Sequence, residues 1–188
     1  MVVSPALLAL DLRRFRSASR PRQALKKALN QWGARWLGGG HFAQVYGIGS
    51  LALKVVSNRR NACYLRFARF CRRYHAEFPC LPKVFHVLDF GTFSVVILER
   101  LAHRRYGQRL CPKVRRAVRS VLADNRKVAR EMAAALGLPL RRWAWMVQKI
   151  EGFTRHHPRS SWDLHTDNVM FRGRGVGRQW VLTDPITR

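Results

Sequence analysis

Residues 35–56 read RWLGGGHFAQVYGIGSLALKVV and determine the fold of the first half of the chain. Short apolar runs rich in Val, Ile and Leu alternate here with glycine-containing segments. This alternation predicts a strand–turn–strand–turn–strand unit, with its second turn at Gly49-Ser50. The residues on either side of the unit have apolar side chains at helical spacing, so the sheet is expected to lie between helices in the sequence.

The remaining sequence alternates helical and extended patterns. Apolar spacing and the positions of proline and glycine predict helices over 5–17, 21–32, 61–77, 112–137 and 140–152. Short segments rich in Val, Ile, Leu and Phe predict further strands over 83–88, 92–98, 169–171 and 180–183. This order predicts the α+β class, with two lobes and a hinge near Glu99. The expected divisions are a helical extension, a sheet-rich lobe and a mostly helical lobe, over 1–36, 37–100 and 101–188.

Composition limits the possible function classes. The chain has 188 residues, and 36 Lys and Arg against 10 Asp and Glu give a net charge of +26. A hydrophobic content of 47% excludes a disordered polypeptide. The charge attracts any polyanion, but no zinc-finger or RRM signature accompanies it. A generally basic surface with non-specific affinity for nucleic acid is therefore favoured over a dedicated nucleic-acid site.

Cysteine spacing and hydropathy indicate the cellular compartment of the protein. The four cysteines, Cys63, Cys71, Cys80 and Cys111, form no C-x-x-C pair, so reduced thiols are expected. No apolar run approaches the ~18–20 residues of a membrane span. The positive charges follow the apolar segment 1–10 instead of preceding it, unlike a secretory signal. The sequence predicts a cytoplasmic protein with no membrane partner.

Three features of the first half suit nucleotide binding. Gly38, Gly39 and Gly40 lie between two predicted strands, where backbone N–H groups can approach phosphates, and Val45 can cover an adenine ring. Lys54 interrupts an apolar strand; it either faces solvent or binds the α- and β-phosphates of a nucleotide. The apolar run 95–98 ends at the acidic residue Glu99.

The strongest feature is the stretch DLHTDN, residues 163–168, which a strand separates from Asp184. Phosphoryl transfer to a hydroxyl needs one carboxylate that orients the hydroxyl and accepts its proton. It also needs an amide and a second carboxylate that hold Mg²⁺ against the phosphates. Asp163, Asn168 and Asp184 offer these groups. The alternative is a β-hairpin with capping Asp and Asn residues, but the order of all four features favours phosphoryl transfer.

Five stretches carry a more specific resemblance: LGGGHFAQVY, LALKV, SVVILERL, SSWDLHTDNVMF and VLTDPI. Together they resemble the early serine/threonine protein kinases of short-tailed lytic bacteriophages, from about Ala24 to the C-terminus. The resemblance implies a two-lobed protein-kinase-like fold that binds ATP and Mg²⁺. It also implies action early in infection, in the cytoplasm of the bacterial host, on host proteins of transcription or RNA processing such as RNA polymerase.

The resemblance implies a role for each matching residue. Asp163 would be the catalytic acid–base group, and His165 would lie close to the transferring phosphoryl, where many kinases have Lys. Asn168 and Asp184 would be metal ligands. The ATP site would be lined by Gly38, Gly39, Gly40, Val45, Ala52 and Lys54, with backbone groups of Glu99 and Leu101 pairing to adenine.

The sequence departs from the kinase pattern in several places. The usual H-R-D reads Ser161-Trp162-Asp163, Asp184 is followed by Pro185 instead of Phe, and the chain ends at residue 188. We therefore expect a minimal, C-terminally truncated kinase fold without switching by activation-loop phosphorylation. The predicted helix 61–77 has one acid, Glu77, in its last turn, so the acidic partner of Lys54 stays open.

Two other function classes remain. One is a catalytically weak kinase-fold protein that binds and inhibits host RNA polymerase or another nucleic-acid machine through its basic surface. The other is a small-molecule phosphotransferase of the aminoglycoside type, which shares the D-L-H-x-x-N pattern. Substrates of that type are cationic and call for an acidic pocket, which a +26 chain disfavours.

Overall fold

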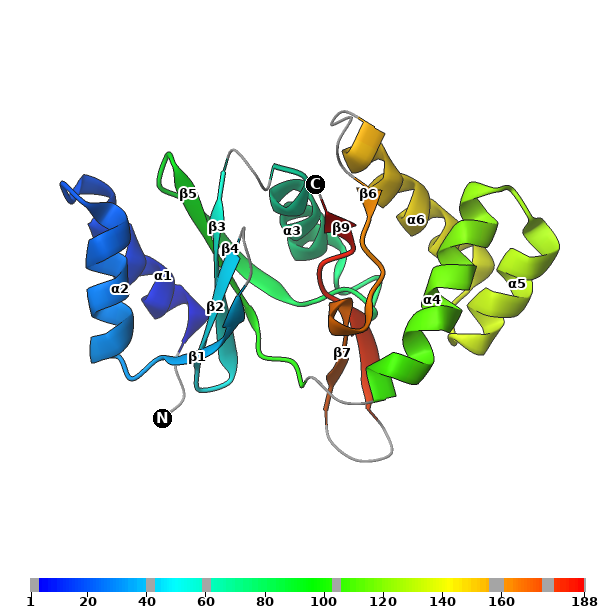
Figure 1. Cartoon of the computed structure of the whole chain (residues 1–188), viewed down its shortest axis with the longest axis horizontal. Helices are drawn as coiled ribbons and strands as arrows, with labels where there is room; N and C mark the ends of the chain where they lie inside the picture. The colour runs from blue at the N-terminus through cyan, green and yellow to red at the C-terminus, as the bar shows by residue number, and fades with distance from the viewer. Residues whose placement is uncertain are drawn as a thin grey trace. The chain divides into compact units, whose positions relative to one another are not determined.

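The chain folds into two compact units, seen in the computed structural model (Figure 1). The structure describes residues 4–39, 43–58, 62–102, 106–155, 161–173 and 178–187. The first unit comprises Met1–Ala76 and Pro82–Leu101, and the second comprises Glu77–Leu81 and Ala102–Arg188. The predicted α+β class is confirmed, because helices and antiparallel sheets both contribute to the chain. Among the described residues, no helix has the length and apolar character of a membrane span.

The first unit is built on a five-stranded antiparallel sheet of order β1-β2-β3-β5-β4. Its strands are β1 Arg35–Gly39, β2 Ala43–Ile48, β3 Leu51–Ser57, β4 Val84–Asp89 and β5 Phe93–Glu99. The predicted turn at Gly49-Ser50 is confirmed, and Gly49 has a φ of +55°, a conformation that glycine adopts without steric cost. Helix α3, Ala62–Tyr74, connects β3 to β4. This sheet with one inserted helix is the N-lobe arrangement that the resemblance to protein kinases implies.

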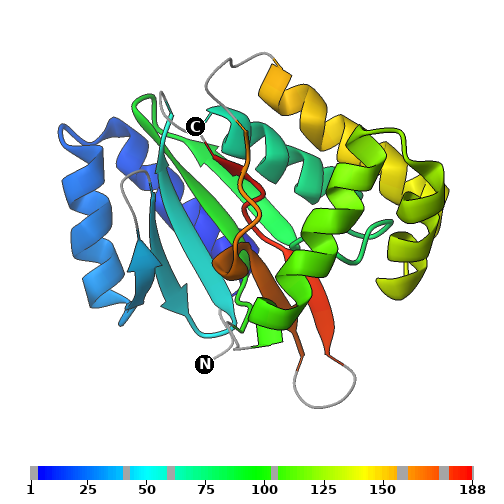
Figure 2. The same ribbon diagram turned by 45° about the vertical axis from the view of Figure 1, so that its right-hand side comes forward.

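The two faces of this sheet have different neighbours (Figure 2). Helices α1 Pro5–Arg13 and α2 Pro21–Gln31, joined by a short 3₁₀ segment η1 Arg14–Ser17, cover one face. Their leucines, such as Leu12 and Leu29, pack against Leu53, Val95 and Ile97. The N-terminal helices therefore belong to the hydrophobic core of the first unit. The opposite face of β3 contacts α3.

The second unit combines three helices with two small sheets. The helices are α4 Tyr106–Leu122, α5 Arg126–Ala135 and α6 Leu140–Arg155, which bury Trp143, Met146 and Ile150. One sheet pairs β6 Ser161–Trp162 with β9 Ile186–Thr187, and the other pairs β7 Val169–Arg172 with β8 Gln179–Leu182. A short 3₁₀ segment, η2 Thr166–Asn168, lies between β6 and β7.

The prediction of a single helix from Pro112 to Gly137 is wrong. Helix α4 begins six residues before Pro112, at Tyr106, and contains the proline in its interior. Proline cannot donate a backbone hydrogen bond there, and the helix buries the side chains of Val114 and Ala117 beyond it. The helix then ends at Leu122, and Asp124, with a φ of +50°, separates it from α5.

Candidate active-site loop

Four of the predicted catalytic and metal-binding residues, Asp163, His165, Asn168 and Asp184, lie next to the short strands of the second unit. Strands β6 and β9 are antiparallel, with Trp162 opposite Ile186. The backbone N–H of Asp163 donates to the Pro185 carbonyl over 2.7 Å, which extends this pairing by one residue. Asp163 follows β6 and Asp184 precedes β9, so the pairing brings the two acid-bearing segments side by side.

Asn168 connects these two segments. Its side-chain Nδ2 donates to the Asp163 carbonyl over 2.8 Å, and its own carbonyl accepts the Thr183 N–H over 2.9 Å. The residue is 7% exposed, so few water molecules compete for these bonds. Because Nδ2 is engaged, the amide presents its oxygen, which is the atom that a hard cation requires.

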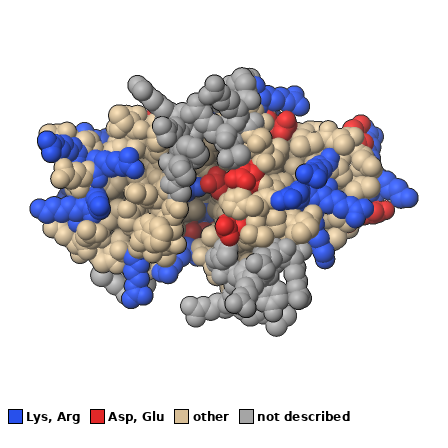
Figure 3. Space-filling view, in the orientation of Figure 1, with Lys and Arg blue, Asp and Glu red and all other residues tan. Residues whose placement is uncertain are grey.

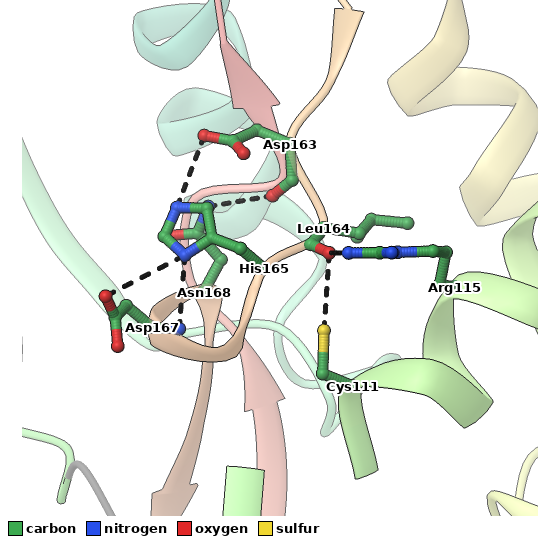
Figure 4. Close-up of polar contacts among 7 residues, drawn as sticks. All are labelled: Cys111, Arg115, Asp163, Leu164, His165, Asp167 and Asn168. Atoms are coloured by element: carbon green, nitrogen blue, oxygen red, sulfur yellow. Dashed lines mark hydrogen bonds and ion pairs between the residues drawn. The ribbon is translucent and has the colours of Figure 1, made fainter. Parts of the chain in front are cut away.

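His165 contacts the Asp163 carboxylate (Figure 4). Its Nε2 lies 3.4 Å from Asp163 Oδ2, and its Nδ1 accepts the backbone N–H of Asp167 over 3.3 Å. An accepting Nδ1 leaves the proton of the neutral ring on Nε2, which faces Asp163. The ring thus orients one oxygen of the carboxylate. The Asp163 side chain is 33% exposed, which leaves it accessible to a substrate hydroxyl.

Helix α4 holds the peptide that follows Asp163. Arg115 donates to the Leu164 carbonyl from Nε over 3.2 Å and also from Nη2, and the Cys111 Sγ donates to the same oxygen over 3.3 Å (Figure 4). Burial raises the pKa of the Cys111 thiol, and the Arg115 charge partly offsets that shift. The thiol therefore stays protonated near neutral pH and can donate. Leu164 itself is buried.

The side-chain oxygens of Asn168 and Asp184 are of the chemical type that Mg²⁺ binds in proteins. Asp184 is half-buried, its Oδ1 atom is buried, and its neighbour Thr183 is hydrogen-bonded to Asn168. Magnesium in phosphoryl-transfer sites takes one or two protein oxygens and completes its shell with phosphate and water. Within the described part of the chain, no group of three or more His, Cys, Asp or Glu side chains is arranged to hold a metal ion.

The predicted nucleotide-binding side chains of the first unit share one face of its sheet. Val45 on β2 lies directly opposite Lys54 on β3, and Ala52 lies two residues before Lys54. Alternation along β3 places them on the face away from α1 and α2, because Leu53 and Val55 belong to the core on the other face. Val45, Ala52 and the Lys54 ammonium group thus lie on the same face of the sheet.

Lys54 lies over an aromatic ring of α3. Its Nζ is 3.7 Å from the ring centroid of Tyr64, which is 4% exposed. Helix α3 ends at Tyr74, so Glu77 follows the helix instead of lying in its last turn, and it is part of the second unit. The first turn of α3 therefore presents a ring to Lys54.

The other residues predicted to bind the nucleotide lie at the ends of strands of the first unit or just after them. Gly38 and Gly39 end β1, where a Cβ on Gly39 would come within 2.9 Å of the Ala43 carbonyl oxygen, so only glycine fits there without a shift. Gly40 is outside the described residues. The backbone N–H of Glu99 donates to the Lys83 carbonyl over 2.9 Å. This N–H group is therefore already hydrogen-bonded within the protein. Leu101 is the last residue of this unit.

Sequence reasoning missed Tyr64, Cys111 and Arg115. Arg115 is one of 29 arginines, and no local pattern distinguishes it from the others. The absence of acids from α3 was visible in the sequence, and a search for an aromatic residue in the first turn of this helix would have found Tyr64.

Comparisons with known proteins identify no family for this chain. No protein-family model matches it, and no curated protein matches it. Among the solved structures that match is the crystal structure of Rad53 1–466 in complex with AMP-PNP, with a TM-score of 0.43 and 14% identity. The match covers 80% of this chain and 36% of the Rad53 chain, so the chain spans little more than a third of that protein.

Proposed function

We propose that the chain is an ATP- and Mg²⁺-dependent protein kinase that phosphorylates Ser or Thr hydroxyls. The observation that carries the proposal is the pair of hydrogen bonds through which Asn168 joins the Asp163 and Asp184 segments. A carboxylate, an amide oxygen and a second carboxylate held in this way are the groups that phosphoryl transfer needs. We further propose that the enzyme is of the phage type, with host transcription or RNA-processing proteins as substrates in the infected bacterium.

The residues of the second unit would divide the reaction between them. As the hydroxyl oxygen forms its bond to the γ-phosphorus, the bond from that phosphorus to the bridging oxygen breaks and ADP leaves with the electron pair. Asp163 orients the hydroxyl and takes its proton. His165 would hold the second oxygen of this carboxylate through its Nε2, close to the transferred phosphoryl group. Asn168 and Asp184 would hold Mg²⁺, whose charge offsets that of the phosphates.

The first unit would bind the nucleotide. Val45 and Ala52 offer apolar surface for the adenine ring, and Lys54 on the same face offers a positive charge for the α- and β-phosphates. The hairpin that includes Gly38 and Gly39 lets backbone N–H groups approach phosphate oxygens without side-chain interference.

The test is incubation of the protein with γ-labelled ATP and Mg²⁺, alone and with bacterial lysate. We expect labelled protein with the wild type and a loss of about 10²–10⁴-fold in Asp163→Ala, because general-base catalysis is removed. Asp184→Asn should lose label and need a higher Mg²⁺ concentration. Asp124→Asn is the matched control, since this exposed acid of the same unit lies in the α4–α5 connection and should leave labelling intact.

The basic charge favours one alternative, a kinase-fold protein that acts by binding. Lys and Arg side chains are scattered over the face drawn in Figure 3, whereas its acidic groups gather mainly near the middle of the view. A net charge of +26 gives affinity for nucleic acid and its enzymes. Absence of label on every acceptor, together with co-purification of RNA polymerase, would support this alternative and contradict the kinase.

A further inference from the structure

We infer that Tyr64 is the positioning residue for Lys54, and that its aromatic ring does the work for which protein kinases use a helix carboxylate. The contact with Lys54 is a fact of the first unit alone. Its consequence for catalysis rests on the proposed kinase function. The inference concerns how the ammonium group of Lys54 is oriented toward a triphosphate when α3 contains no Asp or Glu.

The geometry of the contact is that of a close cation–π interaction. The Lys54 Nζ lies 3.7 Å from the Tyr64 ring centroid, well inside the ~6 Å within which a ring attracts a cation. The ring is 4% exposed and Lys54 is half-buried, so water screens the attraction weakly. Phe67, one helical turn further along α3, packs against Tyr64 with ring centroids 6.4 Å apart and restricts the ring's orientation.

The position of Tyr64 suits this role. It is the third residue of α3, and the sequence of this helix, ACYLRFARFCRRY, contains no Asp or Glu. Lys54 is fixed on the other side by β3, where it pairs with Val45 on β2 and with Val96 on β5. The ammonium group is thus held between a central strand of the sheet and the first turn of the helix.

A ring and a carboxylate would hold Lys54 with different electrostatic results. A carboxylate cancels the ammonium charge while it positions it, whereas a tyrosine ring has no net charge. The contact with Tyr64 therefore adds no negative charge that would compete with the phosphate oxygens of ATP. Loss of the ring should leave the lysine charged but poorly aimed, which weakens both ATP binding and its alignment for transfer.

The kinetic test replaces the ring and then restores it. We expect Tyr64→Leu to lower kcat/KM for ATP by about 10- to 30-fold, the range of a desolvated cation–π contact. Tyr64→Phe keeps the ring and should recover all but about threefold of the wild-type value. Tyr64→Met, whose flexible side chain fills the space without a ring, should behave like Tyr64→Leu and covers the case in which the leucine variant does not fold. Tyr74→Leu makes the same change at the other end of α3 and serves as the control.

A second readout needs no activity. In protein labelled with ¹³C at the lysine ε-carbon, the seven lysines give seven signals, and Lys54→Ala identifies the one from Lys54. The ring current of Tyr64 should shift this signal upfield in the wild type and in Tyr64→Phe. In Tyr64→Leu and Tyr64→Met the Lys54 signal should move downfield, while the other six signals, including those of Lys83 and Lys149 near other rings, stay in place.

The two readouts separate this inference from the proposed function. An unshifted Lys54 signal in the wild type, or kcat/KM for ATP unchanged in a folded Tyr64→Leu or Tyr64→Met variant of an active enzyme, would overturn the inference alone. An upfield Lys54 signal in a wild-type protein that labels no acceptor would overturn the kinase function and, with it, the catalytic role of Tyr64. The inference is supported when the signal and kcat/KM change together in the ring-less variants and both recover in Tyr64→Phe.

Discussion

Three backbone groups of Asp163 and Leu164 are held by separate partners. Its N–H donates to Pro185, its carbonyl accepts from Asn168, and the next carbonyl, that of Leu164, accepts from Arg115 and Cys111. Each bond alone is worth only about 1 kcal/mol, but together they restrict the rotation of both peptides that flank the carboxylate. A carboxylate that is fixed in this way can meet a hydroxyl without first paying an ordering entropy.

Arg115 donates to the Leu164 carbonyl from two nitrogens, so its removal tests this idea directly. We expect Arg115→Met to lower kcat about 10- to 100-fold with a smaller change in KM for ATP, because a loop displaced by about 1 Å costs this much in rate. Arg115→Lys, which cannot offer two donors in one plane, should fall between. Steady-state kinetics and hydrogen exchange of residues 161–173 would measure both effects.

The neighbouring arginine supplies the control for that experiment. Arg116 is exposed on the same helix, so Arg116→Met changes the charge equally without touching the loop. Equal kcat values in the Arg115→Met and Arg116→Met variants would contradict a positioning role for Arg115.

The sequence distinguishes the residues that are proposed to carry out chemistry better than the residues that position them. The spacing of Asp163, Asn168 and Asp184 is rare enough to be noticed, because few acids occur in this chain. The contacts of Arg115 and Tyr64 depend on which side chains the fold brings together from distant segments. The spacing of residues in the sequence does not show which side chains meet in the fold. With so many arginines, nothing in the sequence distinguishes Arg115 from the others.

At the scale of elements, the break between α4 and α5 shows where periodicity fails. Apolar residues recur at helical spacing on both sides of the break, so the pattern predicts one continuous helix. The interruption depends on Asp124 in a left-handed conformation and on the side chain of Asn125, which accepts the Val128 N–H over 3.2 Å. Strands β6 and β9 were missed for another reason: each has two residues, too few for an alternating pattern.

We expect Asn125→Ala to lower the free energy of unfolding by about 0.5–2 kcal/mol, because the first turn of α5 loses its capping acceptor. Asn125→Asp retains an acceptor at the same place and should stay close to the wild type. Urea unfolding followed by circular dichroism would measure the difference. A loss of equal size in both variants would show that the cap contributes nothing.

At the scale of the whole molecule, the large positive charge is the main electrostatic feature. At pH 7 the chain carries +26, and its seven histidines add further charge as the pH falls. Self-repulsion of this kind weakens a compact state and is reduced by salt. His86 on β4 is a histidine whose pKa is shifted by its local surroundings. Burial first, and then the charges of Arg72 on α3 and Arg13 on α1, lower the pKa of His86 below its usual 6.5.

The sign of the resulting pH dependence follows from linkage. The unfolded chain binds a proton at His86 near pH 6.5, whereas the folded chain binds it only at lower pH. Between these two pKa values the unfolded state holds more protons, so the contribution of His86 to stability falls as the pH is lowered from about 7 to 5. His86→Gln removes this contribution. We therefore expect the melting temperature of the variant to fall less over this range than that of the wild type, as measured by circular dichroism.

Salt separates the two causes of the shift. The repulsion from Arg72 and Arg13 is screened at high ionic strength, since the Debye length shrinks from ~10 Å at 0.1 M to ~3 Å at 1 M, whereas the desolvation cost remains. The difference between wild type and His86→Gln should therefore shrink in 1 M NaCl without disappearing. Melting curves that run parallel from pH 7 to pH 5 at low salt would contradict the lowered pKa. A difference that vanishes completely in salt would assign the whole shift to the two arginines instead of to burial.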